Sequence, residues 1–238
     1  MTARPIGLNA DLGEGAGSDD DLLALVTAAS IACGGHAGDP ASMRTAVRAA
    51  ADRGVAVGAH PSYLDRDGFG RRDLAVPLVE LRRQVLAQVR DLGRVADDAG
   101  VAVTHLKAHG ALYNAAMVRA DLALLLTEVA ATALATPLPV YALPGSALAT
   151  TADEAGLPVV REGFADRAVR PDGTLVPRSE PGAVLRDAAE VRGRMAILAP
   201  LVDTVCVHGD TPGALLIARA ARDGLVDAGY GLVGAGPR

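Results

Sequence analysis

The chain has 238 residues, of which 50% are apolar and 21% are charged, a composition typical of a globular protein that can bury a substantial core. Its formal net charge of −5 and its 3% aromatic content provide neither the basic surface nor the stacking side chains that nucleic-acid binding needs. No apolar run approaches about 18 residues and the N-terminus lacks the apolar stretch of a signal peptide, so we expect a cytoplasmic protein without a membrane span.

Short apolar runs alternate with longer segments of helical periodicity along the chain. Continuous Val, Ile and Ala runs bounded by Gly and Pro are typical of strands buried on both faces, as in parallel sheets. We predict seven such strands, over residues 6–12, 29–35, 55–61, 101–109, 139–145, 157–164 and 203–210.

Amphipathic helices are predicted between these strands. Residues 77–99 repeat apolar side chains at helical spacing and stop before Gly100, a residue suited to a helix C-terminus. Residues 182–198 show the same periodicity. Two N-cap residues, each followed by a first-turn proline, indicate where further helices begin: Asp39-Pro40 and Thr211-Pro212.

The repeated βα order predicts one domain over residues 1–238, since no linker, repeat or low-complexity tract interrupts it. In a chain of this length, repeated βα units favour an irregular TIM-like barrel of about seven strands, with an open doubly wound sheet as the alternative. Two longer loops, residues 61–76 after the third strand and residues 165–181 after the sixth, are predicted to be lids or binding loops.

Polar side chains suited to catalysis follow nearly every predicted strand. In a βα barrel the carboxyl ends of the strands converge on one mouth, so residues far apart in the chain share one pocket. The residues at these ends are Asn9, Asp11, Glu14, His36, Asp39, His60, Lys107, His109, Asn114, Glu162, Asp166, His208 and Asp210.

Lys107 is the only lysine in a sequence that otherwise uses arginine throughout. An ammonium group is a compact, tunable point charge, and a guanidinium group cannot replace it in that role. Lys107 is therefore expected either to pair with Asp11 or Glu14, or to act as an electrostatic catalyst or proton donor. The only two asparagines, Asn9 and Asn114, also stand in strings at strand ends.

Several residues also have a purely structural interpretation. Asp39 fits an N-cap, and each histidine fits a buried structural role. His105 shares a face with Lys107 only if the strand stays regular, so it is not assigned to the site. Cys33 and Cys206 fit small buried thiols rather than a disulfide, because we expect a reducing compartment.

Three types of chemistry use His, carboxylate and Lys side chains together. Metal-assisted hydrolysis would use His36, His60 and Asp11 as ligands around an activated water. Acid–base hydrolysis of an amide would use a carboxylate to activate water and a His or Lys to stabilise the oxyanion. Phosphate handling would use Lys107 and loop arginines. The sequence contains neither a Walker-type GxxxxGK[ST] loop nor a GxSxG nucleophile elbow.

The chain contains, in this order, the strings "LNADLGEG", "ASIACGGHAGDP", "GVAVGAHPSYLDRDGFGRR", "HLKAHGALYN", "GFADRAVRPDGTLVPRSEPGAVL" and "VHGDTPGA". Together they resemble the LamB/YcsF family, the 5-oxoprolinase A subunits, from residue 6 to about residue 228. Ala108 stands where the family usually has Pro in a "KPHGALYN" string, a change that can relax the backbone but removes no reactive group.

The resemblance implies a fold similar to the glycoside hydrolase/deacetylase barrels, in agreement with the βα order. It also implies ATP-dependent opening of the 5-oxoproline lactam to L-glutamate, with ATP and Mg²⁺ used by a complex that includes subunits B and C. Whether this chain binds ATP or a metal without those partners stays open. The alternatives are a stand-alone, metal-dependent, deacetylase-like hydrolase and a non-catalytic scaffold in the complex.

Under the leading interpretation the candidate residues form a catalytic and a substrate-binding group. The catalytic group supplies a general base, Asp11 or Glu14, and positive charge for a phosphoryl group or oxyanion, from Lys107 with His109 or His60. The substrate-binding group is Asn9, His36, Arg71, Arg72, Asn114, Arg178 and His208, with the arginines expected to hold the substrate carboxylate.

Overall fold

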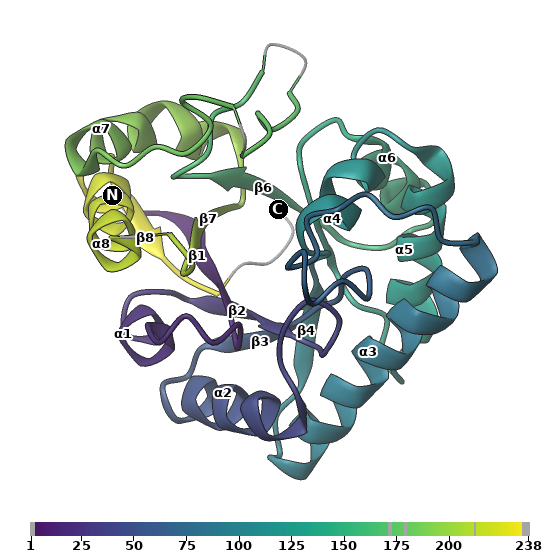
Figure 1. The fold of residues 1–238 in the computed structure, drawn as a ribbon. Coiled ribbons are helices and arrows are strands. Elements are labelled where there is room, and N and C mark those ends of the chain that lie inside the picture. Colours follow the sequence, from purple (N-terminus) through teal and green to yellow (C-terminus); the bar gives the residue numbers. More distant parts are fainter. Residues whose placement is uncertain (1–2, 171–172, 179, 212, 235–238) are drawn as a thin grey trace.

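The computed structural model describes residues 3–170, 173–178, 180–211 and 213–234. Seven parallel strands close into a barrel because β1 pairs with β2 on one side and with β7 on the other (Figure 1). This confirms the predicted seven-stranded barrel. The strands are β1 (Arg4–Leu12), β2 (Ala28–Ala32), β3 (Ala56–His60), β4 (Val103–Leu106), β5 (Val140–Ala142), β6 (Val159–Phe164) and β7 (Thr204–His208).

A short additional strand, β8 (Tyr230–Leu232), was not predicted from the sequence. It runs parallel to the first residues of β1, with Arg4 opposite Tyr230. The same end of β1 does not pair with β2, whose register with β1 starts only at Asn9 opposite Ala28. β8 therefore extends the sheet beside the start of β1 without entering the closed ring.

Helices surround the barrel (Figure 1). None of the helices in the described part of the chain has the length and apolar character needed to cross a lipid bilayer. The helices are α1 (Asp19–Leu23), α2 (Pro40–Asp52), α3 (Leu78–Asp98), α4 (Gly110–Ala116), α5 (Ala120–Thr132), α6 (Ala147–Glu154), α7 (Ala188–Leu198), the 3₁₀ turn η1 (Ala199–Leu201) and α8 (Ala214–Asp227).

Two of the predicted helix boundaries are confirmed. The Asp39 carboxylate accepts hydrogen bonds from the backbone N–H groups of Ala41 and Ser42, so Asp39 caps α2 and Pro40 occupies its first turn. At the end of α3, Gly100 adopts a left-handed φ of 70°. This conformation lets the backbone N–H of Val101 reach the carbonyl of Ala96 and close the helix.

The predicted start of the helix at residues 182–198 is wrong. α7 begins at Ala188, where the Asp187 carboxylate accepts from two backbone N–H groups. Val184 lies upstream in an extended segment that bridges antiparallel to Arg167. Leu185 of this segment packs against the buried apolar core, but the segment forms no helical turn, so its helical spacing of apolar residues does not indicate a helix.

The predicted cap of α8 falls partly outside the described residues, because Pro212 is not among them. The helix begins at Ala214, and Gly213 occupies the N-cap position with a left-handed φ of 83°, so the predicted N-cap at Thr211 is wrong. The Thr211 carbonyl accepts from the Ala214 N–H at 2.9 Å.

The barrel interior is polar, whereas the layer between strands and helices is apolar. Outward residues such as Leu8, Ile31 and Leu106 belong to the buried apolar core. Inward residues make contacts across the ring: Asn9 Nδ2 donates to Thr204 Oγ1 at 3.0 Å, and the His105 ring stacks on Tyr141. This polar interior prepares the floor of the site at the carboxyl ends of the strands.

His105 takes a structural position in this interior. Its Nε2 lies 3.2 Å from Ser30 Oγ, and burial lowers the pKa of its imidazole to about 3. A Cβ atom at Gly58 would lie 2.0 Å from the same ring nitrogen, so the neighbouring strand leaves room for the ring only by carrying glycine there.

Candidate active site

Lys107 extends from the end of β4 across the barrel to residues of three other strands. Its Nζ lies 2.8 Å from Asp11 Oδ1, 2.9 Å from Glu162 Oε1, 3.2 Å from Asn9 Oδ1 and 3.0 Å from Cys206 Sγ. The Lys107 side chain is only 2% exposed. A single ammonium group therefore holds two buried carboxylates, and its N–H donors already face protein acceptors. We refer to Lys107, Asp11 and Glu162 as the lysine cluster.

Burial and charge act in opposite directions on this cluster. Burial lowers the pKa of the Lys107 ammonium, but Asp11 and the other nearby acidic groups outweigh burial and raise that pKa well above its usual value. Burial likewise raises the pKa of the Asp11 carboxyl, but the charges of His60 and Lys107 hold it well below its usual range. Lys107 and Asp11 are therefore both charged at neutral pH.

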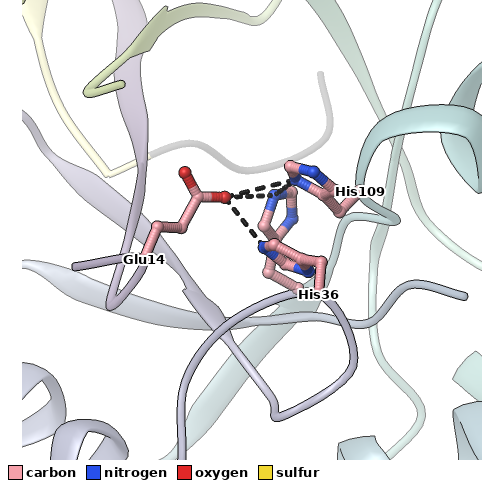
Figure 2. Close-up of side chains that lie close together, drawn as sticks. Glu14, His36 and His109 are labelled. Atoms are coloured by element: carbon pink, nitrogen blue, oxygen red, sulfur yellow. Dashed lines mark hydrogen bonds and ion pairs between the residues drawn. The ribbon is translucent and has the colours of Figure 1, made fainter. Parts of the chain in front are cut away.

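A second cluster lies beside the first and contains one carboxylate and several imidazoles. Glu14 Oε1 lies 2.9 Å from His36 Nε2, 3.2 Å from His109 Nδ1 and 3.8 Å from His60 Nε2. His109 Nδ1 lies 2.9 Å from His60 Nε2. Figure 2 shows the Glu14 carboxylate facing His36 and His109, whose rings stack with their centroids 3.6 Å apart. We refer to these four residues, Glu14, His36, His60 and His109, as the histidine cluster.

The loops after β1 and β2, the last residue of β3 and the N-cap residue of α4 supply the histidine cluster. Its side chains are at most 7% exposed. Burial lowers the pKa of both His36 and His109 below the usual value, although Glu14 acts in the opposite direction. Burial would raise the pKa of Glu14, but His109 and His36 outweigh burial and lower that pKa when their facing ring nitrogens are protonated and donate to the carboxylate.

Each histidine of this cluster is held by the ring nitrogen that faces away from Glu14. His36 Nδ1 lies 3.0 Å from Ser62 Oγ, and His60 Nδ1 lies 2.8 Å from the Lys107 carbonyl oxygen. His109 Nε2 lies 3.0 Å from the Phe69 carbonyl oxygen. Phe69 has a left-handed φ of 52°, a conformation that costs a non-glycine residue energy and is often found at functional sites.

A pocket of about 340 Å³ opens above the two clusters. Its volume lies in the range of small-molecule sites. Asp11, His60, Lys107 and His109 are among its lining residues, as are Tyr113, Asn114, Phe164, Arg167 and His208. Both long loops reach it, since Arg71 from the loop at 61–76 and Arg178 from the loop at 165–181 also line the pocket.

The two loop arginines converge on one carboxylate after β7. Arg71 forms an ion pair with Asp210, and Arg178 Nη1 lies 3.4 Å from the other oxygen of the same carboxylate. The guanidinium of Arg71 also lies over the Phe69 ring, 5.0 Å from its centroid. The pocket rim is therefore cationic, with an acidic residue that keeps the two arginines together.

His208 joins the site from the end of β7. Its Nδ1 lies 2.9 Å from Asp166 Oδ1, and its Nε2 lies 4.0 Å from Asp11 Oδ2. Burial raises the pKa of the Asp166 carboxyl, but the charge of His208 and its hydrogen bond outweigh burial, so the pKa is lowered. Asp166 thus orients the His208 ring toward Asp11.

The structure brings most of the predicted site residues together but separates four of them from the pocket lining, one of which is Glu14 of the histidine cluster. Asn9 is fully buried beneath Lys107, and His36 lies behind His109. Arg72 forms an ion pair with Asp65 of its own loop. Asp39 is confirmed only as a helix cap.

Sequence reasoning missed several features of the site. Glu162, predicted to follow the sixth strand, lies inside β6 and is fully buried. Cys206, interpreted as a structural thiol, receives a hydrogen bond from Lys107. Two signals were available: a charged residue in an apolar strand, and a cysteine two positions before His208 and therefore on the same face of its strand.

Among the described residues, two groups of donor atoms are arranged closely enough to hold a metal ion. One is the histidine cluster, and the other comprises Asp11, Cys206 and His208; within each group the donor atoms lie within 4.8 Å of one another. The ligand set predicted from the sequence, His36, His60 and Asp11, draws on both groups.

A closed barrel of seven parallel strands with a buried polar site at their carboxyl ends defines a (β/α)-barrel protein. A sequence model of the LamB/YcsF family matches residues 6–236, so the chain belongs to the LamB/YcsF family. A curated relative from Streptomyces griseus, by name the A subunit of a 5-oxoprolinase, is 48% identical over 242 residues, which cover 93% of this chain and 96% of the relative.

Solved structures agree with this family and fold. The lactam utilization protein from Thermus thermophilus superimposes with a TM-score of 0.88 at 36% identity, over 98% of this chain and 100% of that protein. A family 4 carbohydrate esterase from Streptomyces lividans matches 98% of this chain and 92% of its own length with a TM-score of 0.53, but only 14% identity. The second likeness shows a shared deacetylase-type fold and nothing about activity.

Proposed function

We propose that this chain is the A subunit of an ATP-dependent 5-oxoprolinase and takes part in opening the 5-oxoproline ring to L-glutamate. The names of its relatives support this activity. The structural support for this function comes from the lining and the size of the pocket. Its lining includes Asp11 and Lys107, with Arg71 and Arg178 at the rim, and it is sized for a small substrate.

The substrate is a small anion with a resonance-stabilised amide, and the pocket supplies a complement to each part. Arg71 and Arg178 offer guanidinium groups that can bind a carboxylate in a bidentate manner. The lactam ring then extends toward Asp11, His60 and His109. In this pose the rim binds the substrate carboxylate and the buried groups face the bond that breaks.

Of the two carboxylates predicted as a general base, Asp11 has the better position. Asp11 lines the pocket, whereas Glu14 is held within the histidine cluster. Asp11 is ionised and oriented by Lys107, so it can accept a hydrogen bond from a water placed above it. In this proposal Lys107 acts through Asp11 and through the positive charge it places beneath the pocket, because its own N–H groups are occupied.

Coupling to ATP activates the amide, since phosphorylation of its oxygen makes the carbon susceptible to water. The ring opening consumes one water, and the hydrolysis of the phosphoryl bond consumes another. Because the sequence has no Walker-type loop, we assign ATP with Mg²⁺ to a site completed by the partner subunits B and C. This chain then supplies the pocket in which water attacks.

The test is glutamate release from 5-oxoproline by the purified chain, with and without ATP and with and without subunits B and C. Release that requires ATP and all three subunits is the expected result. Release by the chain alone would instead establish a stand-alone hydrolase, an outcome for which the histidine cluster provides a reason. Glutamate release at the wild-type level by a complex that contains the Lys107→Met chain would show that this chain is a non-catalytic scaffold.

A further inference from the structure

The hydrogen bonds of His60 and His109 determine where their protons lie. His60 Nδ1 faces the Lys107 carbonyl oxygen at 2.8 Å, and His109 Nε2 faces the Phe69 carbonyl oxygen at 3.0 Å. A carbonyl oxygen can only accept, so both of these nitrogens carry the ring proton. In the neutral rings, His60 Nε2 and His109 Nδ1 are therefore unprotonated, and these are the two nitrogens that lie 2.9 Å apart.

The hydrogen bonds of Ser62 determine where the proton of His36 lies. Ser62 Oγ donates its proton to the Tyr63 carbonyl at 2.8 Å, so it must accept at the 3.0 Å contact with His36 Nδ1. His36 Nδ1 then carries the proton, and Nε2 presents a lone pair to Glu14 Oε1 at 2.9 Å. Three imidazole lone pairs and a carboxylate oxygen thus converge on one point.

Four converging lone pairs repel one another unless a cation lies between them. No lysine or arginine within the described residues forms an ion pair with Glu14, and Lys107 is already committed to Asp11 and Glu162. The other group of donor atoms differs on this point. There, the Lys107 ammonium lies 2.8 Å from Asp11 and 3.0 Å from Cys206, so the chain itself supplies the cation.

The spacing of the donor atoms matches a metal coordination shell. Zn²⁺ binds imidazole nitrogen and carboxylate oxygen at about 2.0–2.2 Å, which gives a tetrahedron with edges of about 3.3–3.6 Å. Four of the six donor separations in the histidine cluster are 2.9, 2.9, 3.2 and 3.8 Å, which bracket that range, and all six lie within 4.8 Å. The outer nitrogens also bond to fixed carbonyl and hydroxyl oxygens, as metal-bound histidines usually do.

We propose that Glu14, His36, His60 and His109 form a binding site for one divalent transition-metal ion, with Zn²⁺ as the expected ion. Three imidazoles and one carboxylate favour Zn²⁺ and its neighbours over Mg²⁺ or Ca²⁺. Since His60 and His109 also line the pocket, a ligand in the pocket would lie beside the ion. The site does not depend on the proposed lactam chemistry.

The experiment is metal binding by the purified full-length chain, without ATP, substrate or partner subunits. Protein treated with a chelator is titrated with Zn²⁺ in a calorimeter, and with Co²⁺ in a spectrophotometer, where d–d bands report tetrahedral coordination. We expect one ion per chain and a rise in the thermal unfolding temperature with Zn²⁺. A folded wild-type chain that binds no ion, or whose Co²⁺ complex shows only weak octahedral bands, would overturn the site.

Variants identify the ligands. His36→Ala and His109→Ala should each weaken Zn²⁺ binding at least a hundredfold, whereas the matched control His208→Ala, from the other donor group, should bind as the wild type does. Loss in His208→Ala with retention in His36→Ala would move the ion to Asp11 and Cys206 and so contradict the proposal. If the ligand variants do not fold, the wild-type Co²⁺ spectrum decides. Because no turnover is measured, a failed glutamate assay leaves this result unaffected.

Discussion

Asp11 and Glu14 stand three residues apart and are both buried, yet their surroundings differ. Asp11 is neutralised by Lys107 at 2.8 Å, a charge that the chain supplies permanently. Glu14 faces only imidazoles, at 2.9, 3.2 and 3.8 Å. The first carboxylate has a cation that the chain supplies, whereas the second belongs to a cluster whose positive charge must come from protons or from a bound ion.

This difference predicts that one cluster stabilises the fold without a bound ion, whereas the other does so only when an ion is bound. Removing one partner of a buried ion pair leaves an uncompensated charge and costs about 3–5 kcal/mol. A group neutralised by an exchangeable ion stabilises the fold only in proportion to the free ion present. The lysine cluster is therefore expected to contribute to folding under all conditions near neutral pH, and the histidine cluster only when it is loaded.

The largest effect is expected for Lys107→Met. Two buried carboxylates lose their counter-charge, so the free energy of unfolding should fall by about 3–5 kcal/mol, as measured by urea denaturation. Glutamate release by the assembled complex should fall about a hundredfold to a thousandfold. As a control, Lys107→Met combined with Glu162→Gln should recover part of the stability without recovering activity. A fully active Lys107→Met complex would contradict the role given to Lys107.

In protein treated with a chelator, Glu14→Gln should change the free energy of unfolding only slightly, in contrast to Lys107→Met. Its amide is neutral and can donate a hydrogen bond to one of the facing nitrogens, so the unfolding free energy should stay within about 1 kcal/mol of the wild type. Zn²⁺ should then stabilise the wild type more than the variant, in thermal unfolding with and without the ion. A loss in chelator as large as that of Lys107→Met would show that imidazolium charge, rather than a metal, neutralises Glu14.

The barrel was predictable because its strands are continuous apolar runs between Gly and Pro. Parallel strands buried on both faces leave that signature, and the βα order then fixes which ends converge. β8 has only three residues, Tyr230–Leu232, and carries no such run. The start of α7 was misplaced because apolar residues near Val184 pack as an extended segment antiparallel to Arg167.

The site was predictable only to the level of strand ends. Two members of the lysine environment, Glu162 and Cys206, lie inside strands, and their inward orientation depends on contacts across the barrel. The adjacent arginines Arg71 and Arg72 could not be told apart, because the fold of the loop around Phe69 decides which one faces the pocket. Such choices depend on tertiary contacts between distant residues.

Arg71 and Arg72 therefore provide a matched pair at the pocket rim. In the assembled complex, Arg71→Ala should raise the KM for 5-oxoproline about tenfold, since a guanidinium that binds a carboxylate contributes about 1.5–3 kcal/mol at most. Arg72→Ala should leave KM unchanged and lower the unfolding temperature, because the buried Asp65 carboxylate loses its ion pair. Equal KM values for the two variants would show that Arg71 does not contribute to substrate binding.

The smallest effect is expected for Asp166, and it concerns the pH dependence of the unfolding free energy. The charge and hydrogen bond of His208 outweigh burial and lower the pKa of Asp166 in the folded chain. A lowered folded-state pKa contributes stability above the unfolded pKa of about 3.9, and that contribution is lost as pH falls from there through the folded value. Asp166→Asn should therefore flatten the acid limb of the unfolding free energy below about pH 4, by at most about 1.4 kcal/mol per pH unit. Urea denaturation between pH 3 and pH 6 (roughly the accessible range) measures this slope, and an unchanged limb would mean that His208 does not lower the pKa of Asp166 in the folded chain.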